Sequence, residues 1–361
     1  MGENQDMMRK PKRLILQWHI TERCNWHCKH CYQDKDFIKD EMDLEGLKKI
    51  LHEYLLLLDK WQLPRGNATI NITGGEPLIR KDFFDFAELL GKHSKRFSWG
   101  ILSNGSLVTE EVAERLKRCG LARYQVSIEG LEEENDRIRG KGAFHKSIEA
   151  LNILIAAGIF TNVSLTLTRS NKGDVPELVK RLDHMGVNSI GTRRLITIGS
   201  GGGMKDELLS PSELRKYFVG LAKIPRKRIR VGMGCESAIL NDIRGRELCG
   251  VVDGRIIIMM PNGDVYPCRR MPIKLGNIKE KSLFEIYHSN KYLELRNIEN
   301  CHDFCKACSN FSKCYGGAYC VKYCYDGRIF VPDIQCVRAH KTLDEPKYAE
   351  GELPERFVGV G

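Results

Sequence analysis

Three cysteines within eight residues constrain this chain more than any other feature. They are Cys24, Cys28 and Cys31, spaced C-x3-C-x2-C, and they directly follow an apolar run typical of a buried strand. Thiolates are soft ligands, which suit iron–sulfur clusters, zinc or Cu(I). A [4Fe–4S] cluster has four irons, so three local cysteines leave one iron open, whereas structural zinc sites tend to use closed sets of four ligands. The spacing therefore favours a cluster with one open corner over a zinc site or a set of structural thiols.

The distribution of the 14 cysteines in this 361-residue chain indicates metal binding rather than disulfide bonds. Seven of them lie between Cys301 and Cys336, in a segment with little apolar periodicity. Such a segment cannot build a large core, so bound metal is expected to hold it together. The N-terminus lacks the apolar stretch of a secretory signal, and no apolar run is long enough to cross a membrane. We therefore expect a cytoplasmic protein without a membrane partner, in a compartment where disulfides are rare.

The net charge of +10 does not by itself indicate a nucleic-acid-binding protein. The densest basic run is Arg226-Lys227-Arg228 with Arg230, and no recognised nucleic-acid-binding motif accompanies it. Such runs are usually solvated surface, so we expect no nucleic acid partner.

Six strand–helix units follow one another before residue 230. The expected strands are residues 14–20, 68–72, 97–102, 124–128, 161–168 and 189–198. The expected helices are residues 43–60, 83–91, 110–119, 145–157, 175–185 and one that begins at Ser210-Pro211. Repeated units of this kind imply a parallel sheet with right-handed crossovers, either curved like a barrel or open and doubly wound. In both arrangements the functional residues gather where the strands end.

The unusual sequences of the first half lie at those strand ends. Gly74-Gly75-Glu76-Pro77 follows the second strand, Ser103-Asn104 follows the third, and residues 127–129 end the fourth. Glycine-rich turns often do no more than connect strands to helices. However, all these loops fall on the same edge of the sheet as the cysteine loop, and paired glycines would let a ligand approach the backbone closely.

Beyond residue 230 the character of the sequence changes. Residues 255–260 and 264–266 flank Pro261-Asn262-Gly263, which predicts a hairpin, and a helical stretch follows over residues 283–297. The cysteines then run Cys301-x3-Cys305-x2-Cys308-x5-Cys314-x5-Cys320-x3-Cys324-x11-Cys336. Zinc remains a competing interpretation for the C-x2-C pair taken alone.

Taken together, these residues resemble the radical S-adenosylmethionine (SAM) enzymes that carry a C-terminal SPASM domain. Three motifs carry the resemblance: C-x3-C-x2-C after the first strand, GGEP after the second, and the distal cysteine series that starts at Cys249-x13-Gly263-x4-Cys268. The resemblance implies an α/β fold, with a partial (β/α)6 TIM-like barrel over residues 13–230. A small cysteine-rich domain for auxiliary clusters would follow over residues 231–345, with tails at 1–12 and 346–361.

The resemblance also implies the chemistry. The cysteine loop would hold a catalytic [4Fe–4S] cluster whose open iron binds the amine and carboxylate of SAM. Reductive cleavage would then give a 5′-deoxyadenosyl radical that abstracts hydrogen from a substrate, while the protein positions the reactants and excludes water. Arg139 matches the arginine that pairs with the SAM carboxylate. The full set of expected SAM contacts is Gly74, Gly75, Glu76, Ser103, Asn104, Ser127 and Arg139.

SPASM domains commonly hold two auxiliary [4Fe–4S] clusters. By resemblance, the outer one would be bound by Cys305, Cys308, Cys314 and Cys336, and the inner one by Cys249, Cys268 and a later cysteine. The family pattern places that later cysteine at position 318, which is Ala318 here. Cys320, Cys324 or both would take its place, and an inner cluster with three ligands would keep an open site. Cys235 and Cys301 are spare thiols.

The expected activity is post-translational modification of a peptide or protein, by a thioether, a carbon–carbon crosslink or oxidation. The first strand begins near residue 13, so we expect any leader to be recognised by another surface or by a separate protein. A flavodoxin or ferredoxin would donate electrons. Sulfatase-type maturation is less favoured, because Arg269 stands where that class has an acidic residue. The alternatives are tetrapyrrole side-chain modification in haem-type biosynthesis and, without catalysis, an iron–sulfur electron carrier or zinc-stapled interaction protein. The last two explain the cysteines but not the strand-end loops.

Overall fold

The structure is a computed structural model of the chain, and it describes residues 10–33, 40–232 and 248–342. Cys235, one of the two spare thiols, lies outside the described residues. No helix among the described residues combines the length and apolar character needed to cross a membrane.

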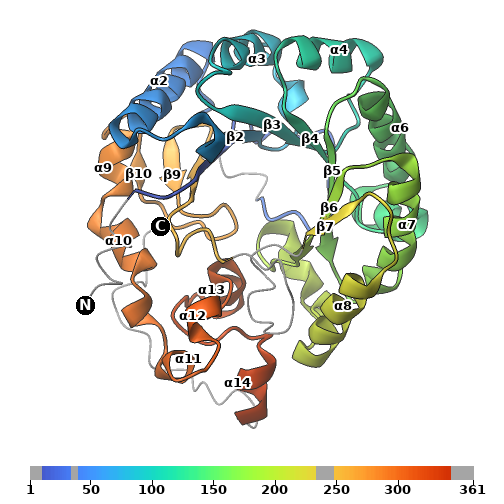
Figure 1. Cartoon of the computed structure of the whole chain (residues 1–361), viewed down its shortest axis with the longest axis vertical. Coiled ribbons are helices and arrows are strands. Elements are labelled where there is room, and N and C mark those ends of the chain that lie inside the picture. Colours follow the sequence, from blue (N-terminus) through green and yellow to red (C-terminus); the bar gives the residue numbers. More distant parts are fainter. Residues whose placement is uncertain (1–9, 34–39, 233–247, 343–361) are drawn as a thin grey trace.

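All six predicted strands form, and they lie in sequence order within one curved sheet (Figure 1). Each pairs with its neighbour in parallel, as the strand–helix repeat predicted. Figure 1 shows the helices of these units on the outer side of the curve, which confirms the barrel-like arrangement over the doubly wound one. The strands are β1 (Leu14–His19), β2 (Ala68–Thr73), β3 (Ser98–Ser103), β4 (Arg123–Ser127), β5 (Thr161–Leu167) and β6 (Ser189–Arg194).

The sheet has further strands at both ends. Beside β6 lies β7 (Arg230–Gly232), and beside β1 lies β8 (Ile256–Met259), both in parallel orientation. The predicted hairpin is confirmed, since β8 pairs antiparallel with β9 (Asp264–Tyr266), and β10 (Gly276–Asn277) continues the edge. The barrel sheet thus continues into the segment expected to be the SPASM domain, and the domain boundary at residue 230 stays a prediction.

Apolar residues at helical spacing seal the outer face of the sheet. Trp18 of β1 and Phe86 of the second outer helix meet edge to face, with ring centroids 4.9 Å apart, and both are fully buried. Cys119, at the C-terminal end of the third, is buried as a structural thiol should be. The outer helices are α2 (Leu44–Trp61), α3 (Phe83–Lys92), α4 (Glu110–Arg118), α6 (Ala143–Ala156), α7 (Val175–Met185) and α8 (Pro211–Lys223).

Helix α5 (Glu132–Arg139) was not predicted from the sequence. Its residues are EEENDRIR, and only Asn135 and Ile138 are buried, so it lacks the apolar repeat that reveals an amphipathic helix. It follows β4 directly and ends at Gly140, whose φ of +109° is accessible to glycine. This short helix carries Arg139 back toward the strand ends.

Beyond β10 the described chain consists of short helices, and those after residue 300 lie across the open side of the curved sheet (Figure 1). The predicted helical stretch over 283–297 is two helices rather than one, because Ser289 caps the start of a second helix. The cysteines beyond it lie on or between helices of at most two turns. The elements are α9 (Leu283–Tyr287), α10 (Asn290–Arg296), α11 (Asp303–Lys306), α12 (Phe311–Cys314), α13 (Tyr319–Asp326) and α14 (Val337–Thr342).

Candidate active site and iron–sulfur ligands

The cysteine loop meets the ends of β3 and β4, as expected for parallel strands that share one edge. The Asn104 side-chain amide, just after β3, donates to Asn25 Oδ1 at 2.9 Å and lies 4.0 Å from Cys24 Sγ. From the other side, Arg139 Nη1 lies 3.7 Å from Cys28 Sγ. Two of the three thiols are therefore contacted by residues that the sequence analysis assigned to the same site.

Gly74 and Gly75 make room for the chain that leads into the cysteine loop. A Cβ atom on Gly74 would stand 2.0 Å from the carbonyl oxygen of Thr21, and one on Gly75 would stand 2.1 Å from that of Arg23. The Gly75 backbone N–H donates to the Thr21 carbonyl at 2.9 Å. The space beside these glycines, which the sequence predicted for a ligand, is thus occupied by the carbonyls of Thr21 and Arg23. Contact of the glycines with SAM stays a prediction.

Glu76 is a buried carboxyl that joins the loop after β2 to the loop after β3. Ser103 Oγ lies 3.0 and 2.9 Å from its two oxygens, and the Asn104 backbone N–H donates to it at 2.9 Å. Burial raises the pKa of Glu76 to about 7, although these donors act in the opposite direction. Its side chain is fully occupied by protein groups, so it positions Ser103 and Asn104. Direct contact of any of the three with SAM is untested.

Glu129, just after β4, is the second buried carboxyl, and its partners come from the cysteine loop, from α5 and from β5. His30 Nε2 lies 2.9 Å from Oε1, the Arg139 guanidinium makes two contacts with that same oxygen, and the Thr166 backbone N–H donates to the other oxygen. Burial alone would raise the pKa of Glu129, but His30 and Arg139 lower it to about 2. This carboxylate therefore holds both the cysteine loop, through His30, and the arginine beside Cys28. A lone glutamate in no recognised motif gave no sequence signal for this role.

Ser127 ends β4 and is half-buried at the same edge. The side chain has no hydrogen bond to any residue in the described part of the chain. Arg139, in contrast, was expected to pair with the SAM carboxylate and here pairs with Glu129. Both assignments to SAM remain predictions.

Arg269 connects the auxiliary region to the cysteine loop. It is 4% exposed, donates to Glu22 Oε2 at 3.0 Å, and lies over the ring of Tyr32 with its guanidinium 5.6 Å from the ring centroid. Arg269 directly follows Cys268, an expected inner-cluster ligand. Its side chain therefore connects that ligand to Glu22 and Tyr32, which lie on either side of the cysteine loop. In sequence it stood out only as the absence of an acidic residue.

The C-terminal region contains two groups of neighbouring thiols, and their assignment to two clusters stays a prediction. In the inner set, Cys268 and Cys320 share a hydrogen bond that lowers the pKa of Cys268. Cys320 also lies near Cys249, whose pKa is raised by burial and by the neighbouring Cys320. Cys324 neighbours Cys320 and donates to the carbonyl of Arg270 at 3.2 Å. Two residues beyond the position of Ala318, Cys320 thus reaches the other inner thiols, and Cys324 lies beside it.

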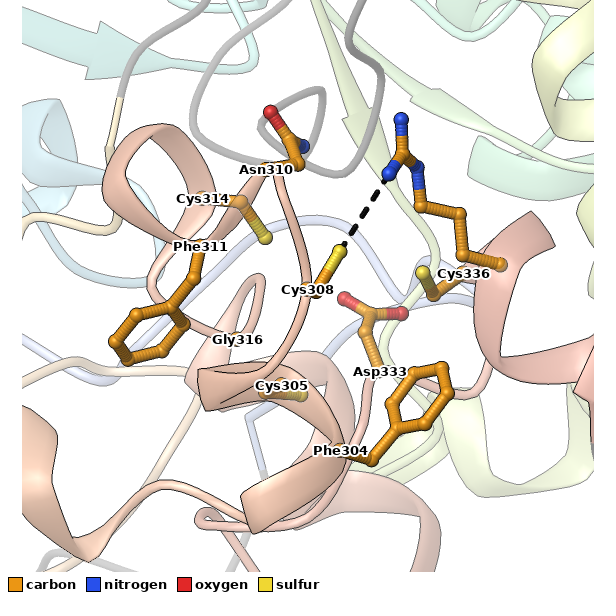
Figure 2. Close-up of a pocket in the computed structure, with 10 residues that line it drawn as sticks. Phe304, Cys305, Cys308, Asn310, Phe311, Cys314, Gly316, Asp333 and Cys336 are labelled. Carbon is orange, nitrogen blue, oxygen red and sulfur yellow. Dashed lines mark hydrogen bonds between the residues drawn. The ribbon is translucent and has the colours of Figure 1, made fainter.

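The outer set surrounds a small hollow shown in Figure 2. Its thiols are those of Cys305, Cys308, Cys314 and Cys336, and the Arg338 guanidinium lies 3.6 Å from Cys308 Sγ. Burial raises the pKa of both Cys305 and Cys314 to about 12, so metal binding must displace their protons. Within the described residues, no three Cys, His, Asp or Glu side chains converge on one point as ligands of a single metal ion. Four thiols around one hollow match the ligand set of an iron–sulfur cluster, and binding of a cluster there stays a prediction.

Comparison with known proteins agrees with this geometry. A family model described as the radical SAM superfamily matches residues 18–190, and one described as an iron–sulfur cluster-binding domain, SPASM, matches residues 249–309. The chain is 29% identical to mycofactocin maturase MftC of Mycolicibacterium smegmatis, over 90% of this chain and 82% of that protein. It is 24% identical to PqqA peptide cyclase of Granulibacter bethesdensis, over 94% and 91%. Fe-coproporphyrin III synthase of Methanosarcina barkeri is 32% identical over a shorter part, 63% of this chain and 55% of that protein.

The fold is also found in solved structures. Streptococcus suis SuiB, in a crystal structure with its precursor peptide SuiA, superposes with a TM-score of 0.71 at 15% identity, over 93% of this chain and 78% of SuiB. Matches to both domains in the expected order, together with the shared fold, show iron–sulfur cluster and SAM binding as general properties. The chain belongs to the radical SAM superfamily, as an enzyme with a C-terminal SPASM domain.

Proposed function

We propose that this enzyme modifies a peptide or protein in the cytoplasm, by forming a thioether or carbon–carbon crosslink or by oxidising a side chain. The observation that carries the proposal is the convergence of the strand-end loops on the cysteine loop, in a chain that aligns along most of its length with two peptide-modifying relatives. Fe-coproporphyrin III synthase aligns over less of either chain. An AdoMet-dependent haem synthase of Nitratidesulfovibrio vulgaris aligns over 85% of this chain and 87% of that protein, but at 24% identity against 29% for the mycofactocin maturase, so the tetrapyrrole alternative has weaker support.

The proposed catalytic ligands are Cys24, Cys28 and Cys31. When bound there, the cluster would pass one electron to SAM, which breaks the carbon–sulfur bond and gives methionine and the radical that takes hydrogen from the substrate. The protein residues position these reactants. Glu129 holds Arg139 beside Cys28, and Glu76 holds Ser103 and Asn104 beside Cys24. Ser127 and the glycine pair complete the proposed SAM site.

For the auxiliary region we propose two clusters with four thiols each. Cys305, Cys308, Cys314 and Cys336 would hold the outer one, because all four line the same hollow. Cys249, Cys268, Cys320 and Cys324 would hold the inner one, which would then have no open site for substrate. Cys301 is left as a non-ligand.

We also propose a docking site for the electron donor beside the cysteine loop. A hollow there is lined by Asn25, Trp26 and His27 of the loop and by Arg139, Lys141 and Lys146 of the α5–α6 region, among others. Lys141 and Lys146 are exposed, and neither has an ion-pair partner among the residues that the structure describes. Acidic donors such as flavodoxin complement this charge, and Arg139 links the hollow to Cys28.

Reversing both charges, Lys141→Glu with Lys146→Glu, tests the donor site. SAM cleavage supported by flavodoxin should slow several-fold at low salt, because charge complementarity acts mainly on association. Cleavage supported by dithionite should not change. The matched control reverses two exposed lysines of α8, Lys216→Glu with Lys223→Glu. Equal flavodoxin rates in the two double variants would refute the site.

The substrate class is tested with any short peptide that the neighbouring genes encode. Reduced enzyme, SAM and that peptide should give a product lighter by two hydrogens per crosslink or oxidation, read by mass spectrometry. Peptide deuterated at the reacting carbon should transfer deuterium into 5′-deoxyadenosine. Deuterium transfer from a porphyrin substrate, with none from any peptide, would favour the haem-type alternative.

A further inference from the structure

Lys322 is a buried lysine that the proposed function leaves without a role. It lies on α13, is 0% exposed, and its Nζ has no hydrogen-bond partner among the described residues. The contact it makes is with the face of Tyr319, whose ring centroid lies 4.3 Å from Nζ. A buried ammonium is costly unless negative charge compensates it, so its surroundings should contain a counter-charge.

The geometry of α13 places Lys322 between the two thiol sets. Cys320 and Cys324 are four residues apart and share the helix face that meets the inner set. Lys322, two residues from each, projects from the opposite face. There its Nζ, Cys301 Sγ and Cys305 Sγ all lie within 4 Å of the point where a Cβ on Gly316 would stand. The ammonium therefore faces the outer set.

Asp333 is the other negative group near this lysine, but it is engaged elsewhere. Both its oxygens are bound by the Arg194 guanidinium, at 2.9 and 2.8 Å. The thiols near Lys322 are those of Cys301, Cys305 and Cys249, and of these Cys305 belongs to the proposed outer cluster. Four thiolates with a [4Fe–4S] cluster carry net negative charge, which increases by one on reduction.

We propose that Lys322 is the internal counter-charge of the outer cluster and raises its reduction potential, so that electrons move from the inner set outward. The proposal rests on the two auxiliary clusters proposed above. A buried positive charge stabilises the reduced, more negative state, and low dielectric in the interior makes this effect larger than that of an exposed lysine at similar range. Lys322 is thus a positioning and tuning residue and makes no contact with substrate.

The test is a redox titration of the anaerobic holoenzyme with dithionite, followed by electron paramagnetic resonance. In Lys322→Met, one auxiliary signal should shift to lower potential, with at least a tenfold lower ratio of reduced to oxidised cluster at fixed potential, or 59 mV for one electron. Lys322→Arg should keep the wild-type potential. The matched control is Lys313→Met, which removes an exposed lysine beside Cys314 and should shift nothing.

Iron and sulfide content separate the possible failures. Wild-type protein without auxiliary clusters would refute the proposed function itself. Full iron in Lys322→Met with unshifted potentials would refute only the role of Lys322. If Lys322→Met binds less iron, the iron contents of Lys322→Gln and Lys322→Arg are compared. Full iron in the arginine variant alone supports a role for the charge. Loss of iron in both variants assigns the lysine to packing and overturns the proposal.

Discussion

The Cys24–Cys31 loop and the C-terminal cysteine region differ in what surrounds their thiols. Around the loop, the neighbouring groups come from other strand ends: Asn104 lies beside Cys24 and Arg139 beside Cys28. In the C-terminal region the thiols neighbour one another: Cys320 contacts Cys268, and four further thiols line one hollow. A three-thiol loop at the rim of polar strand ends leaves room for a ligand on the metal, whereas four thiols close the coordination. We therefore expect the loop to be the site of chemistry and the C-terminal thiols to serve electron transfer.

The largest expected effect is on iron content, when thiols are removed from one of the two regions at a time. Wild-type protein should hold about twelve irons per chain, as expected for three cubanes. A Cys24→Ala, Cys28→Ala, Cys31→Ala variant should keep about eight irons and lose the signal that SAM perturbs. A Cys305→Ala, Cys308→Ala variant should keep that signal and lose about four irons. Loss of all iron from either variant would show that the regions are not independent.

How the C-terminal region is attached is the second point of difference. Arg194 at the end of β6 and Asp333 form an ion pair in which each side chain is 1% exposed, and Gln335 also contacts the arginine at 3.0 Å. Breaking a buried pair on one side leaves an uncompensated charge, so Arg194→Met should destabilise the holoenzyme by about 3–5 kcal/mol. Denaturant unfolding followed by cluster absorbance measures it.

The control is Lys180→Met, since that lysine and Glu177 form a well-exposed pair on α7. Surface pairs of this kind contribute little, and the unfolding midpoint should stay at the wild-type value. A double variant, Arg194→Met with Asp333→Leu, should recover part of the stability that Arg194→Met loses. Equal stability of Arg194→Met and Lys180→Met would contradict the attachment.

The two buried carboxyls of the cysteine-loop site should respond to pH in opposite directions. The pKa of Glu76 is raised to about 7, so its contribution to stability is full below its unfolded pKa near 4.5 and falls as pH rises through 7. The pKa of Glu129 is lowered to about 2, so its contribution is present above pH 4.5 and falls on acidification. Between pH 5 and 8, wild type should lose on the order of 1–3 kcal/mol of its free energy of unfolding through Glu76, and Glu76→Gln should not show this loss.

Unfolding midpoints across this pH range, for wild type and both glutamine variants, provide the measurement. Glu129→Gln should be less stable than wild type at every pH in this range, because the buried Arg139 guanidinium loses its counter-charge. A pH slope that survives in Glu76→Gln would show that another group is responsible.

Cys301→Ser should have the smallest effect on iron content, and it tests whether Cys301 is a ligand of the outer cluster. The Cys301 thiol lies 3.8 Å from the Tyr315 carbonyl and 3.8 Å from the Tyr319 hydroxyl, and serine can make similar contacts. If Cys301 is no ligand, iron content and spectra should match wild type. A loss of about four irons would make it a fifth participant in the outer set.

The sequence predicted the parts of the site that follow from local spacing. The C-x3-C-x2-C loop, the six parallel strands and the hairpin at Gly263 are patterns within short stretches, and the structure contains all three. Contacts between distant residues gave no such signal. Glu129 reaches His30 from 99 positions away, and Arg194 reaches Asp333 from 139. Each is an ordinary charged residue until the fold brings its partner near.

Two other differences have local causes. The GGEP glycines suggested space for a ligand, yet the fold uses that space for the carbonyls of Thr21 and Arg23, which sequence patterns alone do not reveal. The stretch over 283–297 reads as one helix by its apolar spacing, but the Ser289 side chain accepts from the Tyr292 N–H and begins a new helix. Capping chemistry outweighed periodicity at that point.

The central claim is that the three-thiol loop, and not the C-terminal sets, cleaves SAM. It is tested most directly by the 5′-deoxyadenosine released from SAM on dithionite reduction of reconstituted protein. The account predicts release from wild type and from the Cys305→Ala, Cys308→Ala variant, and at least a thousandfold less, about 4 kcal/mol in barrier, from the Cys24→Ala, Cys28→Ala, Cys31→Ala variant. No release from wild type that holds its full iron, or undiminished release from the triple variant, would contradict it.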